Sequence, residues 1–189
     1  GPFLIIPSWL SPPVLADAIP IRLDPGMAFG TGAHPTTQLC LELLPTVVRP
    51  GHLVYDIGTG SGILAIAAAK LGAKVRAVDK DPVAVGVAAE NCALNQVEVP
   101  VLSGDLLANL DEPADLIIAN ILAEVVIELI PQAVAGLKPG GALLASGIID
   151  HKAAQVHSAL ASAGFKIINA LQKEDWVAYL AVRDGKEDA

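Results

Sequence analysis

Short apolar runs alternate with helical patterns from residue 52 onwards. The apolar runs predict strands at 52–57, 74–78, 97–102, 115–119 and 142–146. The segments between and after them predict helices at 63–71, 81–95, 123–135 and 151–163, and a further helix with one apolar face begins at Pro35. Strands that alternate with crossover helices are typical of a parallel sheet covered by helices on both faces.

Two more apolar runs follow the last helix, at 165–171 and 176–182. Only a short loop around Glu174 separates them, and a loop of that length joins antiparallel strands. We therefore predict an α/β protein whose mostly parallel, seven-stranded, doubly wound sheet has one antiparallel strand near the C-terminus. This is the architecture of the Rossmann-like class I methyltransferases.

The first 33 residues differ from the rest of the chain because they combine prolines, glycines and short apolar pieces. We expect residues 1–33 to be a lead-in followed by a glycine-rich loop at 26–32, with no domain of its own. Residues 34–183 then form one catalytic domain, and residues 184–189 are a charged tail.

The composition favours the same fold and limits the kinds of partner that the protein is expected to bind. Hydrophobic residues make up 53% of the chain and aromatic residues 4%, so the core is expected to consist of Ala, Val, Ile and Leu, as in a buried parallel sheet. The formal net charge is -8 and Lys and Arg form no cluster, which argues against a direct nucleic-acid partner. A basic protein or a small molecule is the expected partner.

The cysteines, the histidines and one long apolar segment indicate what to expect of disulfides, metals and membranes. Cys40 and Cys92 are solitary, so we expect them to pack as small hydrophobic side chains in a reducing cytoplasm. The 4 histidines have no metal-binding spacing, so no metal is expected. The apolar segment 116–137 carries polar residues at four-residue intervals, which predicts a surface helix and no membrane span.

A glycine-rich turn follows the first strand of the main domain, with Asp56, Gly58, Gly60 and Gly62 in alternation. Such glycines let the backbone turn tightly and approach a nucleotide-like ligand. Asp79 ends the next predicted strand, where a carboxylate can accept both hydroxyls of a ribose.

Two ligands compete for this turn. The spacing of Gly60, Gly62 and Ala65 fits the dinucleotide fingerprint, which would make NAD the ligand. The alternative frame begins at Asp56, whose carboxylate can help to hold the ammonium group of a methionine and would repel a pyrophosphate. The second frame favours S-adenosylmethionine, while a tight turn without any ligand is the remaining alternative.

Asp105 follows the third predicted strand of the main domain. In methyltransferases of this architecture that position is near the adenine, where a side-chain oxygen could accept a hydrogen bond from the exocyclic amine. The same residue could instead cap a helix in the segment after it. Both interpretations remain open at this point.

The run at 23–37, Leu-Asp-Pro-Gly-Met-Ala-Phe-Gly-Thr-Gly-Ala-His-Pro-Thr-Thr, resembles the signature of the PrmA family. These are bacterial methyltransferases of the eleventh protein of the large ribosomal subunit. The similarity continues at 7–9, 56–62, 119–124 and 146–148, and so covers nearly the whole chain. It implies transfer of methyl groups from S-adenosylmethionine to lysine side chains and an N-terminal α-amine of that ribosomal protein.

The resemblance also implies site residues. Thr37, Gly58, Asp79 and Asn120 match the family's cofactor contacts, and Asn120 is the expected catalytic residue because it ends the fourth strand over the methyl donor. Free N–H groups at the helix start beside Thr37 would favour the cofactor's carboxylate. Phe29 either faces the sulfonium or is buried in the core.

The residues after Asn120 indicate the kind of acceptor. Methyltransferases of adenine or of glutamine amides carry Pro-Pro-aromatic there, whereas this chain has Ile121 and Leu122, which favours an aliphatic amine. His34 is the histidine nearest the site and a candidate base.

The resemblance also leaves the substrate open. Members of the family have a small N-terminal domain that recognises the substrate, and we expect this chain to begin at its linker. A small-molecule amine methyltransferase, a cofactor-binding module without turnover and an NAD-dependent oxidoreductase are the alternatives.

Overall fold

The computed structural model describes residues 1–10, 17–24, 32–108 and 110–183 of the chain. Its centre is a seven-stranded sheet in the order β5-β4-β3-β6-β7-β9-β8. The strands are β3 (Leu53–Ile57), β4 (Lys74–Asp79), β5 (Val101–Ser103), β6 (Ala114–Asn120), β7 (Leu137–Ile149), β8 (Phe165–Lys173) and β9 (Trp176–Arg183). In this sheet β9 runs opposite to the other six strands and so pairs antiparallel with both β7 and β8, which confirms the predicted sheet.

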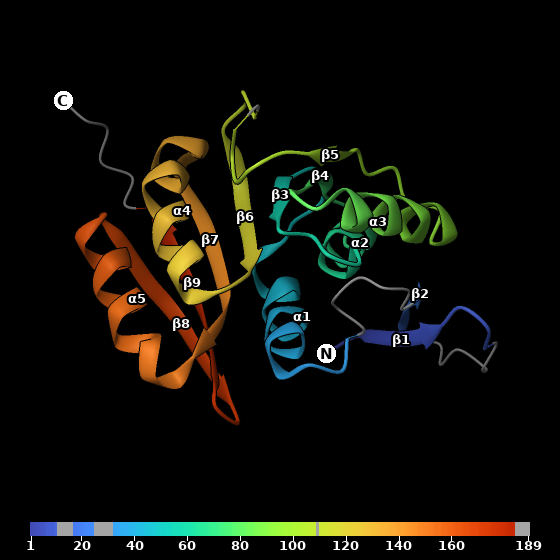
Figure 1. Ribbon diagram of the computed structural model, residues 1–189, viewed down its shortest axis with the longest axis horizontal. Coiled ribbons are helices and arrows are strands. Elements are labelled where there is room, and N and C mark those ends of the chain that lie inside the picture. The colour runs from blue at the N-terminus through green and yellow to red at the C-terminus, as the bar shows by residue number, and fades with distance from the viewer. Residues whose placement is uncertain (11–16, 25–31, 109, 184–189) are drawn as a thin grey trace.

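Helices cover both faces of this sheet (Figure 1). One face carries α1 (Pro35–Val47), α2 (Ile63–Lys70) and α3 (Pro82–Leu94), and the other carries α4 (Ala123–Gly136) and α5 (Asp150–Ser162). Strand β6 shows why both faces are apolar. Leu116 and Ile118 are buried against α1 and α2, whereas Ile117 and Ala119 are buried against α4 and α5. A strand buried on both faces is typical of a parallel sheet.

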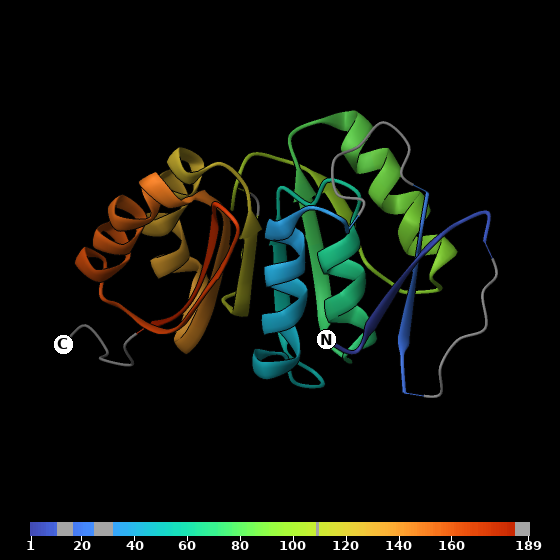
Figure 2. The same ribbon diagram turned by 90° about the horizontal axis from the view of Figure 1, so that it is seen from below.

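The described parts of the lead-in contain two strands that the sequence pattern does not predict. β1 (Phe3–Pro7) and β2 (Ile19–Leu23) pair in parallel as a separate two-stranded sheet. Figure 2 shows this pair beside α2 and α3. Asn95 at the end of α3 anchors β2, since its Oδ1 accepts from the backbone N of Arg22 at 2.8 Å and its Nδ2 donates to the carbonyl O of the same residue at 2.6 Å.

Two strands differ in length from their predictions. β5 pairs with β4 only from Val101 to Ser103, rather than over 97–102, because Pro100 has no N–H to continue the ladder. β7 begins at Leu137, five residues before the predicted start of 142. Gly140 and Gly141 lie in this added part and interrupt the apolar pattern, so the sequence does not predict a strand there.

The apolar segment 116–137 divides between β6 and α4. In the parts of the chain that the structure describes, no helix is long and apolar enough to cross a membrane. Both cysteines are buried free thiols, and burial raises the pKa of Cys40 to about 12, so this thiol is neutral at physiological pH.

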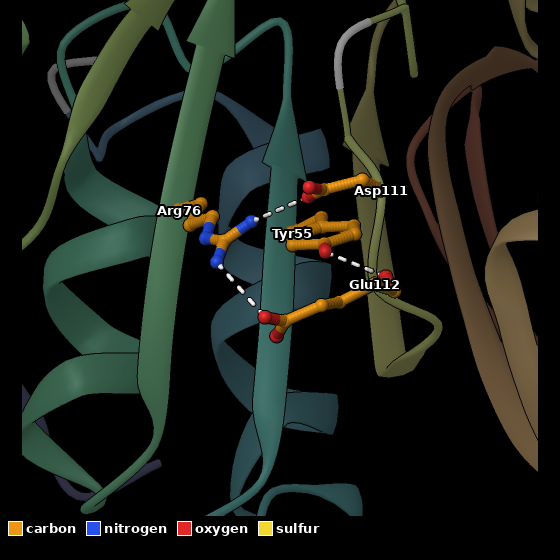
Figure 3. A network of polar contacts seen from close by, with 4 residues as sticks. All are labelled: Tyr55, Arg76, Asp111 and Glu112. Atoms are coloured by element: carbon orange, nitrogen blue, oxygen red, sulfur yellow. Dashed lines mark hydrogen bonds and ion pairs between the residues drawn. The ribbon is translucent and has the colours of Figure 1, made fainter.

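A polar network at the sheet holds the loop that leads into β6 (Figure 3). Tyr55 in β3 donates its hydroxyl to the carbonyl O of Glu112 at 2.6 Å. Arg76, its neighbour in β4, forms ion pairs with Asp111 at 3.4 Å and with the Glu112 carboxylate at 3.6 Å. Exposed ion pairs contribute little stability on their own, so the buried ring of Tyr55 is the main anchor of this loop.

Candidate active site

The glycine-rich turn after β3 lies at the carboxyl edge of the sheet. Gly58, Gly60 and Gly62 have φ of 71°, 55° and 82°, a conformation that side chains other than glycine rarely adopt. At Gly58 space is a second constraint, because a Cβ there would lie 2.5 Å from Cγ2 of Ile121. Gly58 and Gly60 also lie in the lining of a cavity, so a ligand can reach the backbone of the turn from that side.

Asp79 faces this turn from the end of β4. Its Oδ2 accepts a hydrogen bond from the backbone N of Gly60 at 2.9 Å, and its Oδ1 accepts one from the backbone N of Asp81 at 3.0 Å. Two bonds from different loops fix the plane of the carboxylate. A ligand with two adjacent hydroxyls can donate to the remaining lone pairs.

A cavity of about 440 Å³ opens between these strand ends. Its lining residues are Ile57, Gly58, Gly60, Val78, Asp79, Lys80, Asp81, Ala84, Gly104, Asp105, Leu106, Ile121 and Val125. Three carboxylates against one lysine make this acidic cavity suited to a cation. Asp105 begins a turn rather than a helix, since its carbonyl accepts from Ala108 N at 3.1 Å, so the structure does not support the alternative role of Asp105 as a helix cap.

Asp56 lies behind the turn and is only 1% exposed. Its Oδ2 accepts hydrogen bonds from the Thr59 hydroxyl at 2.7 Å and from the backbone N of Ala65 at 3.0 Å. Burial raises the pKa of Asp56 to about 6, against these hydrogen bonds, which lower it. The structure thus places this carboxylate on the turn and the first turn of α2, and not in the lining of the acidic cavity.

Asn120 and Thr37 meet on the other side of the turn. The Nδ2 of Asn120, at the end of β6, donates to Oγ1 of the fully buried Thr37 at 3.3 Å. This contact joins β6 to the first turn of α1, which are 83 positions apart in the sequence. Because the amide nitrogen of Asn120 donates to Thr37, its Oδ1 is the atom that can accept a hydrogen bond from a ligand.

The start of α1 is capped by His34. Its Nδ1 accepts from the backbone N of Thr36 at 3.4 Å and lies 2.8 Å from the Thr36 hydroxyl, and its carbonyl accepts from Thr37 N at 3.1 Å. The prediction of free N–H groups beside Thr37 is therefore wrong. The imidazole also packs edge-on against Trp176, with 4.9 Å between ring centroids.

A second cavity of about 370 Å³ lies here. Its lining residues are His34, Thr36, Asn120, Ile121, Leu122, Gly147 and Trp176. This apolar cavity has Asn120 at its wall and an indole at its rim. Sequence patterns did not single out Trp176, because it reaches the site only through the antiparallel pairing of β9 with β7.

The predicted site residues thus fall into three groups. Gly58, Gly60, Asp79 and Asp105 line the acidic cavity, whereas Asn120 lines the apolar cavity and is bonded to Thr37. Asp56 supports the turn from behind, and Phe29 lies outside the described residues. Among the described residues, no three or more His, Cys, Asp or Glu side chains come together as a metal site.

The order and direction of the strands and the covering helices define the class I methyltransferase fold. A methyltransferase structure from Pyrococcus furiosus shares this fold with a TM-score of 0.70 at 22% identity, over 81% of this chain and 87% of that one. A ribosomal protein L11 methylase structure from Lactobacillus delbrueckii subsp. bulgaricus matches with a TM-score of 0.92 and 40% identity, over 97% of this chain and 95% of that one.

The sequence comparisons agree. Residues 1–184 match the family described as ribosomal protein L11 methyltransferase (PrmA). A ribosomal protein L11 methyltransferase of Geobacillus kaustophilus is 51% identical over 185 residues, which are 96% of this chain and 59% of that protein. The chain belongs to the PrmA family, and it spans about three fifths of the length of the curated relatives it matches.

Proposed function

We propose that this chain transfers methyl groups from S-adenosylmethionine to lysine or N-terminal amines of a large-subunit ribosomal protein. The observation that carries the proposal is the adjacency of two unlike cavities at one sheet edge. One is acidic and backed by a glycine turn, and the other is apolar with a single oriented amide, Asn120.

The acidic cavity fits S-adenosylmethionine better than a dinucleotide. Gly58 and Gly60 line the cavity without a side chain, the Asp79 carboxylate is oriented by two hydrogen bonds and can accept from the ribose hydroxyls, and Asp105 can accept from the adenine amine. The sulfonium and ammonium of S-adenosylmethionine are cations and are attracted by these carboxylates, whereas a pyrophosphate is repelled. When bound, this group supplies an electrophilic methyl, so the protein needs no nucleophile of its own.

The apolar cavity fits an aliphatic amine. Asn120 Oδ1 can accept a hydrogen bond from the amine and direct its lone pair, while Trp176 and Leu122 pack along the aliphatic stem. An apolar environment lowers the pKa of an amine, and the neutral amine is the form that can attack a methyl group. The aromatic face of Trp176 then suits the cationic product. Orientation and desolvation supply the catalysis.

The substrate is assigned through the family. The relatives named above are ribosomal protein L11 methyltransferases, and the acidic net charge of this chain suits a basic ribosomal protein. The reaction then belongs to the cytoplasm. The predicted contacts of Phe29 and Asp56 with the cofactor stay predictions.

Two measurements test the proposal. Titration calorimetry should show binding of S-adenosylmethionine and none of NAD, and Asp79→Asn should weaken the binding at least tenfold because charge-assisted hydrogen bonds to the ribose are lost. Asp111→Asn makes the same change in an exposed ion pair and should leave the affinity unchanged.

The second measurement is mass spectrometry of recombinant L11 after incubation with the protein and S-adenosylmethionine. The mass of a lysine or of the N-terminus is expected to rise by about 14 Da for each methyl group that replaces a hydrogen. Binding without any transfer would leave a cofactor-binding module. Transfer to small amines alone would make this a small-molecule enzyme.

A further inference from the structure

The two cavities share one residue of the described chain. Ile121, the first residue after β6, is part of both linings, whereas Asn120 lines only the apolar cavity and Gly58 only the acidic one. Ile121 is half-buried and also packs against the core beneath α4. Its side chain therefore stands where the two cavities meet.

Two glycines lie against Ile121, Gly58 at its side chain and Gly147 at its backbone. A Cβ on Gly58 would lie 2.5 Å from Cγ2 of Ile121, and a Cβ on Gly147 would lie 2.2 Å from its carbonyl O. Both glycines have positive φ, 71° and 79°. The backbone N of Ile121 donates to the carbonyl O of Ser146 at 3.2 Å. The turn after β3, the strand β7 and the start of α4 thus close around one isoleucine.

We propose that Ile121 is a positioning residue, the wall along which the acceptor amine approaches the methyl group. This inference rests on the proposed function. Methyl transfer requires the amine nitrogen, the methyl carbon and the leaving sulfur to be in line, so the C–N bond forms as the C–S bond breaks. A residue that borders both cavities limits the angle of that approach.

The chemistry of isoleucine suits this role. A β-branched side chain has few χ1 rotamers, so the wall keeps one position while ligands enter and leave. It offers no hydrogen bond that would compete with Asn120 for the amine. Its bulk excludes water from the junction, which keeps the local dielectric low and the amine neutral.

The test compares Ile121→Ala with Ile127→Ala. Both isoleucines are half-buried, both pack against the same core cluster, and Ile127 lies in α4 outside either lining. The two variants should therefore lose similar stability in thermal unfolding. Ile121→Val, which removes one methyl group, serves as a milder variant should Ile121→Ala fail to fold.

The first readout is single-turnover methyl transfer at saturating S-adenosylmethionine. Ile121→Ala should be at least tenfold slower than Ile127→Ala, and Ile121→Val intermediate, because the amine is no longer directed in line. Equal rates in Ile121→Ala and Ile127→Ala would overturn the inference while leaving the proposed function intact.

The second readout needs no turnover. S-adenosylhomocysteine lacks both the transferred methyl and the sulfonium charge. Because Ile121→Ala and Ile127→Ala change no charge, a change between variants in the ratio of its Kd to that of S-adenosylmethionine reports contact with the methyl group. Trimming Ile121 should lower the ratio about threefold, as expected for the loss of a small apolar contact, and trimming Ile127 should leave it unchanged. An unchanged ratio in Ile121→Ala overturns the inference even where the wild type transfers nothing.

Discussion

Asn91 joins the glycine-rich turn to the lead-in of the chain through the carbonyl of Ser61. Its Nδ2 donates to that carbonyl O at 2.9 Å, and its Oδ1 accepts from the backbone N of Asp24 at 2.9 Å. The Asn91 side chain is 1% exposed. One buried amide thus fixes the turn and the start of the signature run, at Asp24, at the same time.

Replacing Asn91 with Asp should uncouple the two segments. An aspartate can still accept from Asp24 N, but it places an acceptor against the carbonyls of Ser61 and Asp24. Both hydrogen bonds that Nδ2 donates, at 2.9 and 3.4 Å, are lost, and a buried charge is left poorly paired. We expect the free energy of unfolding to fall by about 2–3 kcal/mol, measured by urea denaturation. Asn169→Asp makes the same change on the exposed part of β8 and should stay within about 0.5 kcal/mol of wild type. Equal effects at both sites would show that the coupling is absent.

Gly147 should tolerate no side chain. Gly147→Ala combines a positive φ with a Cβ 2.2 Å from the Ile121 carbonyl O, whereas Gly140→Ala has a φ of 76° and nothing within 4 Å. We expect Gly140→Ala to destabilise the protein by about 1 kcal/mol, from backbone strain alone, and Gly147→Ala by more than about 3 kcal/mol. Thermal unfolding measures both. Similar melting temperatures would mean that the Ile121 segment shifts freely.

Asp56 should make the ligand-free protein less stable as the pH rises. Its pKa is raised by burial from 3.8 to about 6, so the folded state holds the proton more tightly than the unfolded state does. The stability from this proton is complete below pH 4 and is lost as the pH rises to 6.

The variant Asp56→Asn should lack this dependence, because an amide oxygen accepts the same two hydrogen bonds without ionising. Between pH 4 and pH 7 the stability of Asp56→Asn relative to wild type should therefore rise, by on the order of 2 kcal/mol. Urea denaturation across that pH range gives the difference. A constant difference would show that Asp56 titrates normally.

Thr37 should act on turnover through Asn120. Thr37→Val keeps the side-chain shape but removes the oxygen that accepts from Asn120 Nδ2, whereas Thr37→Ser keeps that oxygen. We expect Thr37→Val and Asn120→Ala to lower kcat by roughly tenfold or more, the range of a lost orienting hydrogen bond, with little change in cofactor affinity. Thr37→Ser should restore most of the rate. A Thr37→Ser variant as slow as Thr37→Val would indicate a packing role only.

Much of the fold and half of the site were predictable, for one physical reason. Parallel strands bring their carboxyl ends to one edge, so Gly58, Asp79 and Asp105 could be placed together from strand positions alone. The pairing of β1 with β2 could not be predicted, because a short extended run has the same pattern whether or not it has a partner.

The apolar cavity was predictable only in part, because it depends on tertiary register. Trp176 lies beside His34 because β9 returns antiparallel along β7, and no local pattern encodes that register. Likewise, the N–H groups of α1 are occupied by its His34 cap, a local competitor that the dipole argument ignores.

The contact between His34 and Trp176 means that the two cavities are completed at different times during synthesis of the chain. The acidic cavity is lined by residues 57–125, whereas the apolar cavity needs both the first turn of α1 and the first residue of β9. A ribosome that has released the chain through α4 has delivered every lining residue of the first cavity and has yet to deliver Trp176. The apolar cavity, which we propose holds the acceptor amine, is therefore completed only after Trp176 has been synthesised, and a shorter nascent chain has only the acidic cavity.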